Sequence, residues 1–336
     1  MISDIDALVT QLRAAAGPDE TARAAAEARN AVLTKPPGAL GRLEEIAVWY
    51  AGWRGDPRAR IMQPHVLVFA GNHGVTAQGV SAFPSEVTAQ MVANFNTGGA
   101  AINALAETLG AAFSVHPLAL DRPTVDFTQG PAMSAAECIE AINLGWRAVD
   151  HSADILVIGE MGIGNTTSAA AIACALYGGA PAEWTGRGTG VDDAGLARKT
   201  AAVAAGLAAN PGAVGAPFAA LEMLGGREIA AMVGAMAAAR VARIPVVLDG
   251  FIASSAAAVL ARGVPGATHH LIAGHLSAEG GHQKLLDALG LQPILSLGLR
   301  LGEGSGAALA LGIIKAAVAC HSGMATFDEA AVASGA

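Results

Sequence analysis

A glycine-rich segment runs from Gly159 to Ser168 and reads Gly-Glu-Met-Gly-Ile-Gly-Asn-Thr-Thr-Ser, directly after the apolar run Ile155–Ile158. Glycines let the backbone approach a ligand, and a helix that begins after them offers free N–H groups and a positive dipole end to a phosphate. A tight turn with Asn165 or Thr166 capping the next helix is the alternative. The spacing matches neither G-x-G-x-x-G nor G-x-x-x-x-G-K-[ST], which disfavours a standard dinucleotide cofactor and a nucleoside triphosphatase.

Two acidic residues lie among glycines. Glu160 belongs to the first segment, where a carboxylate would repel a phosphate unless a cation lay between them, such as a ribosyl cation formed during glycosyl transfer. Glu303 lies in Leu299–Gly306, after leucines and between glycines. Desolvation there would raise its pKa, which suits a general base near neutral pH. The alternatives are a solvated loop carboxylate for Glu160 and an acid stabilised by a helix N-terminus for Glu303.

Only four lysines occur in the chain, and one of them, Lys199, follows a further glycine-rich loop that itself contains Arg187. Arg187 lies in the loop Gly186–Gly190, and Lys199 belongs to the helical stretch after it. Both are candidate contacts for a phosphate or a carboxylate. A solvated surface charge is the alternative for each.

The histidines and Ser305 point to less specific chemistry. His73 with Asn72 forms a candidate ligand-binding pair, although a lone histidine in a polar turn is commonly structural. A second group of histidines resembles a metal site and consists of His269, His270, His275 and His282. Because no carboxylates occur at a suitable spacing, we expect no metal ion there. Ser305 does not match the G-x-S-x-G motif, which argues against a serine hydrolase.

Composition excludes several classes of protein. The 336 residues carry a formal charge of −8 and show no basic run, so we expect no nucleic-acid partner. Three widely spaced cysteines are typical of reduced thiols in a cytoplasmic protein. The N-terminus has no signal-type apolar core, and the longest uncharged stretch contains too many polar residues for a membrane span. With 14% charged and 53% hydrophobic residues, the chain suits an enzyme with much of its surface buried, including at a subunit interface.

Six short apolar runs alternate with alanine-rich helical stretches, which predicts an α/β fold with an open, mainly parallel, Rossmann-like sheet flanked by helices. The runs are His65–Ala70, Ala112–His116, Ile155–Ile158, Pro245–Leu248, His270–Ala273 and Pro293–Leu295. The helical stretches between them include Val87–Leu109, Thr167–Leu176, Gly195–Ala208, Glu228–Ala242 and Ser305–Ala319. Five of the runs lead into polar, glycine-rich loops. Because ligands bind beyond the carboxyl ends of parallel strands, we expect these loops to meet at one ligand-binding edge.

The two ends of the chain differ from the middle. Residues 1–60 contain three helical stretches, and neither they nor the segment from about residue 304 contains a strand run. We expect residues 1–60 and about 304–336 to form a small helical domain beside a catalytic α/β domain of about residues 61–303. The three helical stretches are Ile5–Ala16, Glu20–Leu33 and Arg42–Gly52.

Seven segments together resemble the nicotinate-nucleotide–dimethylbenzimidazole phosphoribosyltransferases, enzymes of cobalamin lower-ligand assembly, and occur in that family's order. They are Lys35–Glu44, Phe83–Thr88, Gly159–Thr167, Gly186–Gly190, Asp249–Ile252, Leu301–Gly304 and Ser322–Phe327. The resemblance covers the chain from about Lys35 to Glu329, and each of the long motifs is specific.

The resemblance implies transfer of the 5-phosphoribosyl group from nicotinate mononucleotide to 5,6-dimethylbenzimidazole. The products would be α-ribazole 5′-phosphate, with inverted anomeric configuration, and nicotinate. It also implies a cytoplasmic homodimer that uses small-molecule substrates, with no nucleic-acid or membrane partner. No cofactor or metal ion is expected, because the pyridinium of the donor leaves as a neutral pyridine.

The resemblance also assigns roles to individual residues. Glu303 would be the base that takes the benzimidazole proton, and Glu160 would stabilise positive charge on the ribose. The nucleotide would contact Gly162, Asn165, Thr166, Lys199 and Ser277. The base would contact Ser81, Gln90, Met161 and Leu301.

Three positions depart from the family pattern: Asn72 replaces an Asp, Ala39 a common Ser, and Leu276 a basic residue. The last departure argues against a phosphate contact by a cationic side chain at position 276.

Three alternative functions remain open. The acceptor could be another base or a phenol, because apolar pockets discriminate small groups weakly. The protein could also be a nucleotide-dependent oxidoreductase, or a nucleotide-binding protein without turnover.

Overall fold

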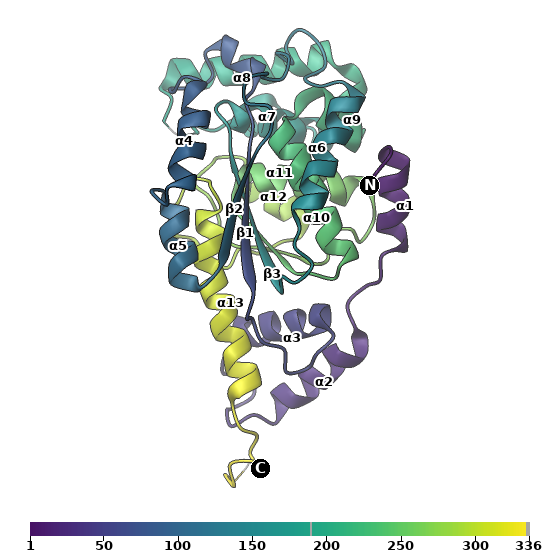
Figure 1. Ribbon diagram of the computed structural model, residues 1–336, viewed down its shortest axis with the longest axis vertical. Coiled ribbons are helices and arrows are strands. Elements are labelled where there is room, and N and C mark those ends of the chain that lie inside the picture. The colour runs from purple at the N-terminus through teal and green to yellow at the C-terminus, as the bar shows by residue number, and fades with distance from the viewer. Residues whose placement is uncertain (189, 334–336) are drawn as a thin grey trace.

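Five parallel strands form one sheet in the order β2-β1-β3-β4-β5, with helices on both faces (Figure 1). The computed structural model describes residues 1–188 and 190–333, so Thr189 of the Gly186–Gly190 motif lies outside the described residues. The strands are β1 (Pro64–Ala70), β2 (Ala112–Pro117), β3 (Ile155–Met161), β4 (Val246–Leu248) and β5 (Leu271–Ala273). The predicted α/β fold with an open parallel sheet is confirmed.

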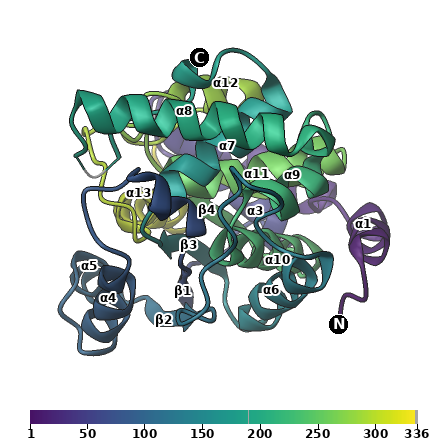
Figure 2. The same ribbon diagram turned by 90° about the horizontal axis from the view of Figure 1, so that it is seen from above.

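Both faces of the sheet are covered, which explains the continuous apolar runs of its central strands. In β1, Leu67 and Phe69 contact one hydrophobic core, whereas Val66 and Val68 contact the other. All four side chains are fully buried. Figure 2 shows the two helical layers on opposite sides of the strands.

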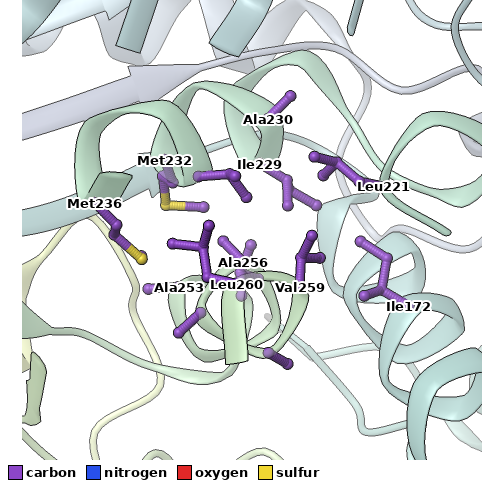
Figure 3. Close-up of a cluster of buried hydrophobic side chains, with 14 of the residues drawn as sticks. Ile172, Leu221, Ile229, Ala230, Met232, Met236, Ala253, Ala256, Val259 and Leu260 are labelled. Carbon is purple, nitrogen blue, oxygen red and sulfur yellow. The ribbon is translucent and has the colours of Figure 1, made fainter. Parts of the chain in front are cut away.

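The first core is covered by the larger of the two helical layers. Its helices are α1 (Ile5–Ala14), α6 (Ala135–Ala148), α7 (Asn165–Tyr177), α8 (Asp193–Ala209), α9 (Pro217–Leu224), α10 (Arg227–Val241), α11 (Phe251–Gly263) and α12 (His282–Leu289). Figure 3 shows its centre, where Met232 and Met236 of α10 meet Ala256 and Leu260 of α11. The alanines keep these two helices close, and the flexible methionines fill the remaining space.

The second core lies under α3 (Arg42–Arg54), α4 (Glu86–Asn96), α5 (Ala101–Leu109) and α13 (Ser305–Gly323). Three short 3₁₀ helices cover Gly74–Gln78, Pro181–Glu183 and Pro211–Ala213. By length and composition alone α13 could cross a membrane, yet 56% of its apolar window is buried and it packs against β3 and β4. Its apolar character therefore serves the core of the protein.

Two sequence predictions about elements are wrong. Pro293–Leu295 is no strand: the N–H groups of Ile294 and Leu295 bond to the carbonyls of Ala273 and Gly274, but only an isolated bridge between Leu295 and His275 forms. Pro293 has no N–H with which to extend the pairing. The predicted helix Val87–Leu109 is two helices, α4 and α5, which are separated at Gly98 with its left-handed φ of +79°. Helices α6, α9, α11 and α12 were not among the predicted stretches.

Residues 20–54 meet the C-terminal part of the chain below the sheet in Figure 1. Arg29 of α2 (Glu20–Ala31) donates hydrogen bonds to the carbonyls of His321 and Met324, and Leu33 bridges to Thr326. Helix α3 packs against α13. By contrast, α1 packs against α10, on the flank of the larger layer (Figure 1). The division of the chain into two domains stays a prediction.

Candidate active site

The loops that follow β3, β4 and β5 meet at the carboxyl edge of the sheet, where they enclose a cavity together with the loop before α13. Its lining includes Glu160 from the end of β3, Gly250 after β4, Ser277 after β5 and Gly302 before α13. This is the edge at which open parallel sheets bind ligands. The predicted convergence of the polar loops is therefore present.

Glu160 is the penultimate residue of β3 and is 6% exposed. Its Oε2 accepts a hydrogen bond from the Asn165 side chain at the start of α7. Burial raises the pKa of Glu160 to about 8, and the negative charges of Asp249, Glu228 and Glu303 act in the same direction, against the bond from Asn165. The carboxyl group thus titrates near neutral pH, where a small change in its surroundings alters its charge.

Glu303 follows the lining residue Gly302 and is 5% exposed. Its backbone is left-handed, with φ +64°, and its N–H donates to the carbonyl of Glu160 at 3.2 Å. Burial raises its pKa to about 7, with a further contribution from Asp249. Within the described chain, its Oε2 has no hydrogen-bond partner. A left-handed non-glycine residue costs about 1–3 kcal/mol, and such strain is characteristic of functional sites.

Asp249, directly after β4, holds the loop that carries Glu303. Its carboxylate accepts hydrogen bonds from the N–H groups of Gly304 (3.2 Å) and Ala307 (2.9 Å), in place of the side-chain cap that α13 lacks. Burial acts to raise the pKa of Asp249, but His275, 3.4 Å away, and the two N–H groups outweigh it and lower the pKa. A Cβ at Gly159 would lie 2.4 Å from the carbonyl carbon of Glu303, so glycine permits this close approach of loop and strand.

The residues predicted to contact the nucleotide lie together. Gly162, Asn165, Thr166 and Ser277 line the cavity. Lys199 of α8 is not part of the lining, but it is 1% exposed and donates to the hydroxyl of the lining residue Thr166 at 2.8 Å. Burial lowers the pKa of Lys199, and the nearby Glu279 opposes that shift. The cavity is thus lined by the start of a helix and by hydroxyls, with the Lys199 cation bonded to one of those hydroxyls.

Comparison with known proteins shows the family of this chain. A family model described as phosphoribosyltransferase matches residues 15–332. A nicotinate-nucleotide–dimethylbenzimidazole phosphoribosyltransferase of Jannaschia sp. (strain CCS1) is 67% identical over 326 residues, which are 97% of each chain. One of Ruegeria pomeroyi is 65% identical over 334 residues, 99% of each chain. The crystal structure of such an enzyme from Thermus thermophilus has a TM-score of 0.88 at 42% identity and covers 94% of this chain and 100% of that one.

The chain belongs to this phosphoribosyltransferase family. The family named from the sequence motifs is thereby confirmed, and so is its α/β fold. The comparisons do not favour the oxidoreductase alternative. They leave the roles of individual residues untested, so these stay predictions.

The four residues predicted to contact the base fall into two groups. Met161 and Leu301 line the cavity, and the Leu301 side chain is 52% exposed. Ser81 and Gln90 are not part of its lining. Ser81 accepts a hydrogen bond from the Phe83 N–H, and Gln90 is exposed on α4.

Helix α4 nevertheless lies against the cavity wall. The Thr88 hydroxyl, two residues before Gln90, accepts a hydrogen bond from the N–H of the lining residue Ile163 at 3.2 Å. A base that extends past Ile163 would therefore meet this helix. The roles of Ser81 and Gln90 stay predictions.

Two residues of the cavity wall were missed in the sequence. Arg300 lines the cavity and donates to the carbonyl of Gly188 at 3.2 Å. Glu279 also lines it and is 9% exposed. Arg300 is next to the predicted contact Leu301, and Glu279 is two residues after the predicted contact Ser277. This proximity in the sequence was the signal that could have identified them. Arg187, in contrast, forms an exposed ion pair with Asp193.

The histidine group has structural partners. His270 bonds to the Met236 carbonyl, and His282 accepts from the Ser277 N–H and contacts the Ser254 hydroxyl. Over residues 1–188 and 190–333 no group of three or more His, Cys, Asp or Glu is placed to hold a metal ion. Asn72 is buried, and its amide donates to the Leu120 carbonyl.

Proposed function

We propose that this protein transfers the 5-phosphoribosyl group of nicotinate mononucleotide to 5,6-dimethylbenzimidazole and releases nicotinate and α-ribazole 5′-phosphate. Relatives that are named for this reaction share up to 67% identity over nearly the whole chain. The observation that carries the proposal is Glu303, a buried acid on a left-handed backbone beside Glu160, with one oxygen unpaired in the described chain.

In the proposed step, a benzimidazole nitrogen attacks the ribose C1′ from the face opposite the nicotinate, so the configuration inverts. The bond between C1′ and the pyridinium nitrogen breaks, and its electron pair stays on that nitrogen, which becomes neutral. The other benzimidazole N–H gives its proton to Glu303. Removing this proton raises the electron density of the nucleophile, a general-base effect of about 10²–10⁴-fold.

Glu160 would face the ribose while positive charge develops at C1′. A carboxylate already in place, in a site that excludes water, stabilises such charge more than bulk water does. Its partner Asn165 would fix its orientation. We assign to Lys199, Thr166, Ser277 and the start of α7 the phosphate and ribose of the donor, because these groups supply a cation, hydroxyls and N–H donors.

The test is incubation of the enzyme with nicotinate mononucleotide and a panel of acceptors: dimethylbenzimidazole, other benzimidazoles, purines and phenols. We expect ribosylated dimethylbenzimidazole, identified by mass and by the anomeric coupling in its NMR spectrum. Glu303→Gln should still bind nicotinate mononucleotide but lose turnover, whereas the exposed control Glu45→Gln should behave as wild type. Absence of any ribosylated product from the wild-type enzyme would refute the proposal.

We also propose a cytoplasmic homodimer that acts only on small molecules. The low share of charged residues, 14%, suits a chain that buries part of its surface against a second copy. Light scattering coupled to size exclusion should give twice the chain mass. A monomer that retains full activity would contradict this part of the proposal.

A further inference from the structure

Glu160 is buried, and so are the three acids that raise its pKa, Asp249, Glu228 and Glu303; these four acids divide into two kinds. Asp249 faces His275, and Glu228 faces His73. Glu160 and Glu303 have no histidine, lysine or arginine within ion-pair distance among the residues described. The unpaired acids are those placed in the proposed reaction. The proposed reaction step assigns no role to the pair of His73 and Glu228.

This pair is fully enclosed. Glu228 lies in the first turn of α10, and its Oε1 accepts from His73 Nε2 at 2.6 Å; both side chains are 0% exposed. The other ring nitrogen of His73 lies 3.0 Å from the Ser168 hydroxyl in the first turn of α7. Ser168 is three residues after Asn165, so the two share one face of that helix. The pair thus supports the helix start that orients Glu160.

The backbone comes so close to the Glu228 carboxylate that two neighbouring positions have no room for a side chain. A Cβ at Gly71 would lie 2.4 Å from Glu228 Oε2, and one at Gly226 would lie 2.7 Å from the same atom and 2.2 Å from His73 Cε1. Loops from two different places in the chain therefore both omit side chains at this point. Despite this enclosure, Oε2 has no hydrogen-bond partner within the described residues. An uncompensated buried oxygen of this kind is costly.

Glu228 also lies directly behind the glycine-rich loop. A Cβ at Gly162 would be 3.2 Å from Glu228 Oε1 and 3.2 Å from the Asn165 amide nitrogen, so the two groups flank the same point. That amide nitrogen donates to Glu160. The charge of Glu228 is among those that raise the pKa of Glu160. The glycine and the amide thus lie between the two carboxyl groups.

We propose that Glu228, held by His73, is a positioning residue that sets the charge of Glu160 and the orientation of the Asn165 turn during phosphoribosyl transfer. This inference rests on the proposed function. The other groups that face Glu160 are Asp249 after β4 and Glu303 before α13, which act on it in the same direction. Asn165 of α7 acts in the opposite direction. Glu228 differs from both acids because it belongs to α10 and is held by His73, which follows β1.

The decisive variant is Glu228→Gln, which retains an oxygen to accept from His73 but removes the charge. The ionised Glu160 is the form that stabilises the ribosyl cation, so kcat/KM should rise with pH as Glu160 loses its proton. Without the Glu228 charge this rise should move to lower pH by roughly one unit. The exposed control Glu107→Gln should leave the profile unchanged.

A direct titration separates this proposal from the proposed function. In protein labelled with ¹³C at the glutamate carboxyl groups, the Glu160 resonance is assigned by its loss in Glu160→Gln. Its midpoint should move to lower pH in Glu228→Gln, whether or not turnover occurs. If wild type lacks turnover but the midpoint moves, the function fails while the coupling stands.

A second variant covers the case in which Glu228→Gln does not fold. In His73→Gln/Glu228→Gln the two amides can bond to each other, and the Glu160 midpoint should again fall. If either folded variant only lowers the melting temperature and leaves both the kcat/KM profile and the Glu160 midpoint in place, the pair is merely structural. That result would overturn the proposal.

Discussion

Glu160 and Glu303 lie side by side, yet the chain holds them in different ways. Glu160 belongs to a regular strand whose backbone bonds to β1 and β4 fix its place. Glu303 belongs to a loop in which three successive residues, Gly302, Glu303 and Gly304, are left-handed. That loop is held by contacts to Asp249 and to the Glu160 carbonyl. Both acids therefore depend on contacts between distant segments, but regular strand pairing fixes Glu160, whereas a few specific loop contacts fix Glu303.

The largest difference should appear when each acid is made neutral. Glu303→Gln should lower kcat by about 10²–10⁴-fold, because the proton of the acceptor has nowhere to go. Glu160→Gln should lower it by about 10²–10³-fold, because only electrostatic stabilisation is lost. Steady-state kinetics with both substrates measures this, with Glu45→Gln as the exposed control. Equal loss of activity in all three variants would remove the distinction between the acids.

An intermediate effect should follow from loosening the Glu303 loop without touching either acid. Asp249→Asn removes the charge that holds the N–H groups of Gly304 and Ala307, and should lower the free energy of unfolding by about 0.5–2 kcal/mol. It should also lower the pKa of Glu303, since Asp249 is one cause of its elevation. Chemical denaturation and the pH dependence of kcat/KM measure the two effects. A variant with unchanged stability and an unchanged pH profile would show that Asp249 does not hold the loop.

The effect that is smallest per unit of pH concerns the pH dependence of stability. The folded-state pKa values of Glu160 and Glu303, about 8 and about 7, lie above the ordinary value of 4.5. Between pH 4.5 and 8 these two groups thus bind more protons in the folded protein than in the unfolded chain, so their contribution to stability falls as pH rises, by at most about 1.4 kcal/mol per unit for each group. Melting curves should show a shallower fall in Glu160→Gln than in wild type. A steeper fall of the melting temperature with pH in this variant would contradict a raised pKa for Glu160.

The site could be predicted only in part. Glu160 was accessible because a buried strand followed by glycines and a helix is a local pattern, and β1 and β3 were found for the same reason. The positions of Ser81 and Gln90 relative to the cavity could not be derived, since they depend on how α4 packs. Pro293–Leu295 resembled a strand in composition and lies beside the end of β5, but its pairing is confined to one isolated bridge, between Leu295 and His275.

The amino-acid sequence by itself determined the class of fold and the family and pointed to the two acids of the candidate site, because apolar periodicity and glycine-rich motifs are properties of neighbouring residues. Only the tertiary structure decided which acids are paired with a histidine. His73 and Glu228 are 155 positions apart, and Asp249 reaches across to a helix start 55 residues later. The charge and the pKa of a side chain depend on distances and burial in the folded protein, and separation along the sequence determines neither the distances nor the burial.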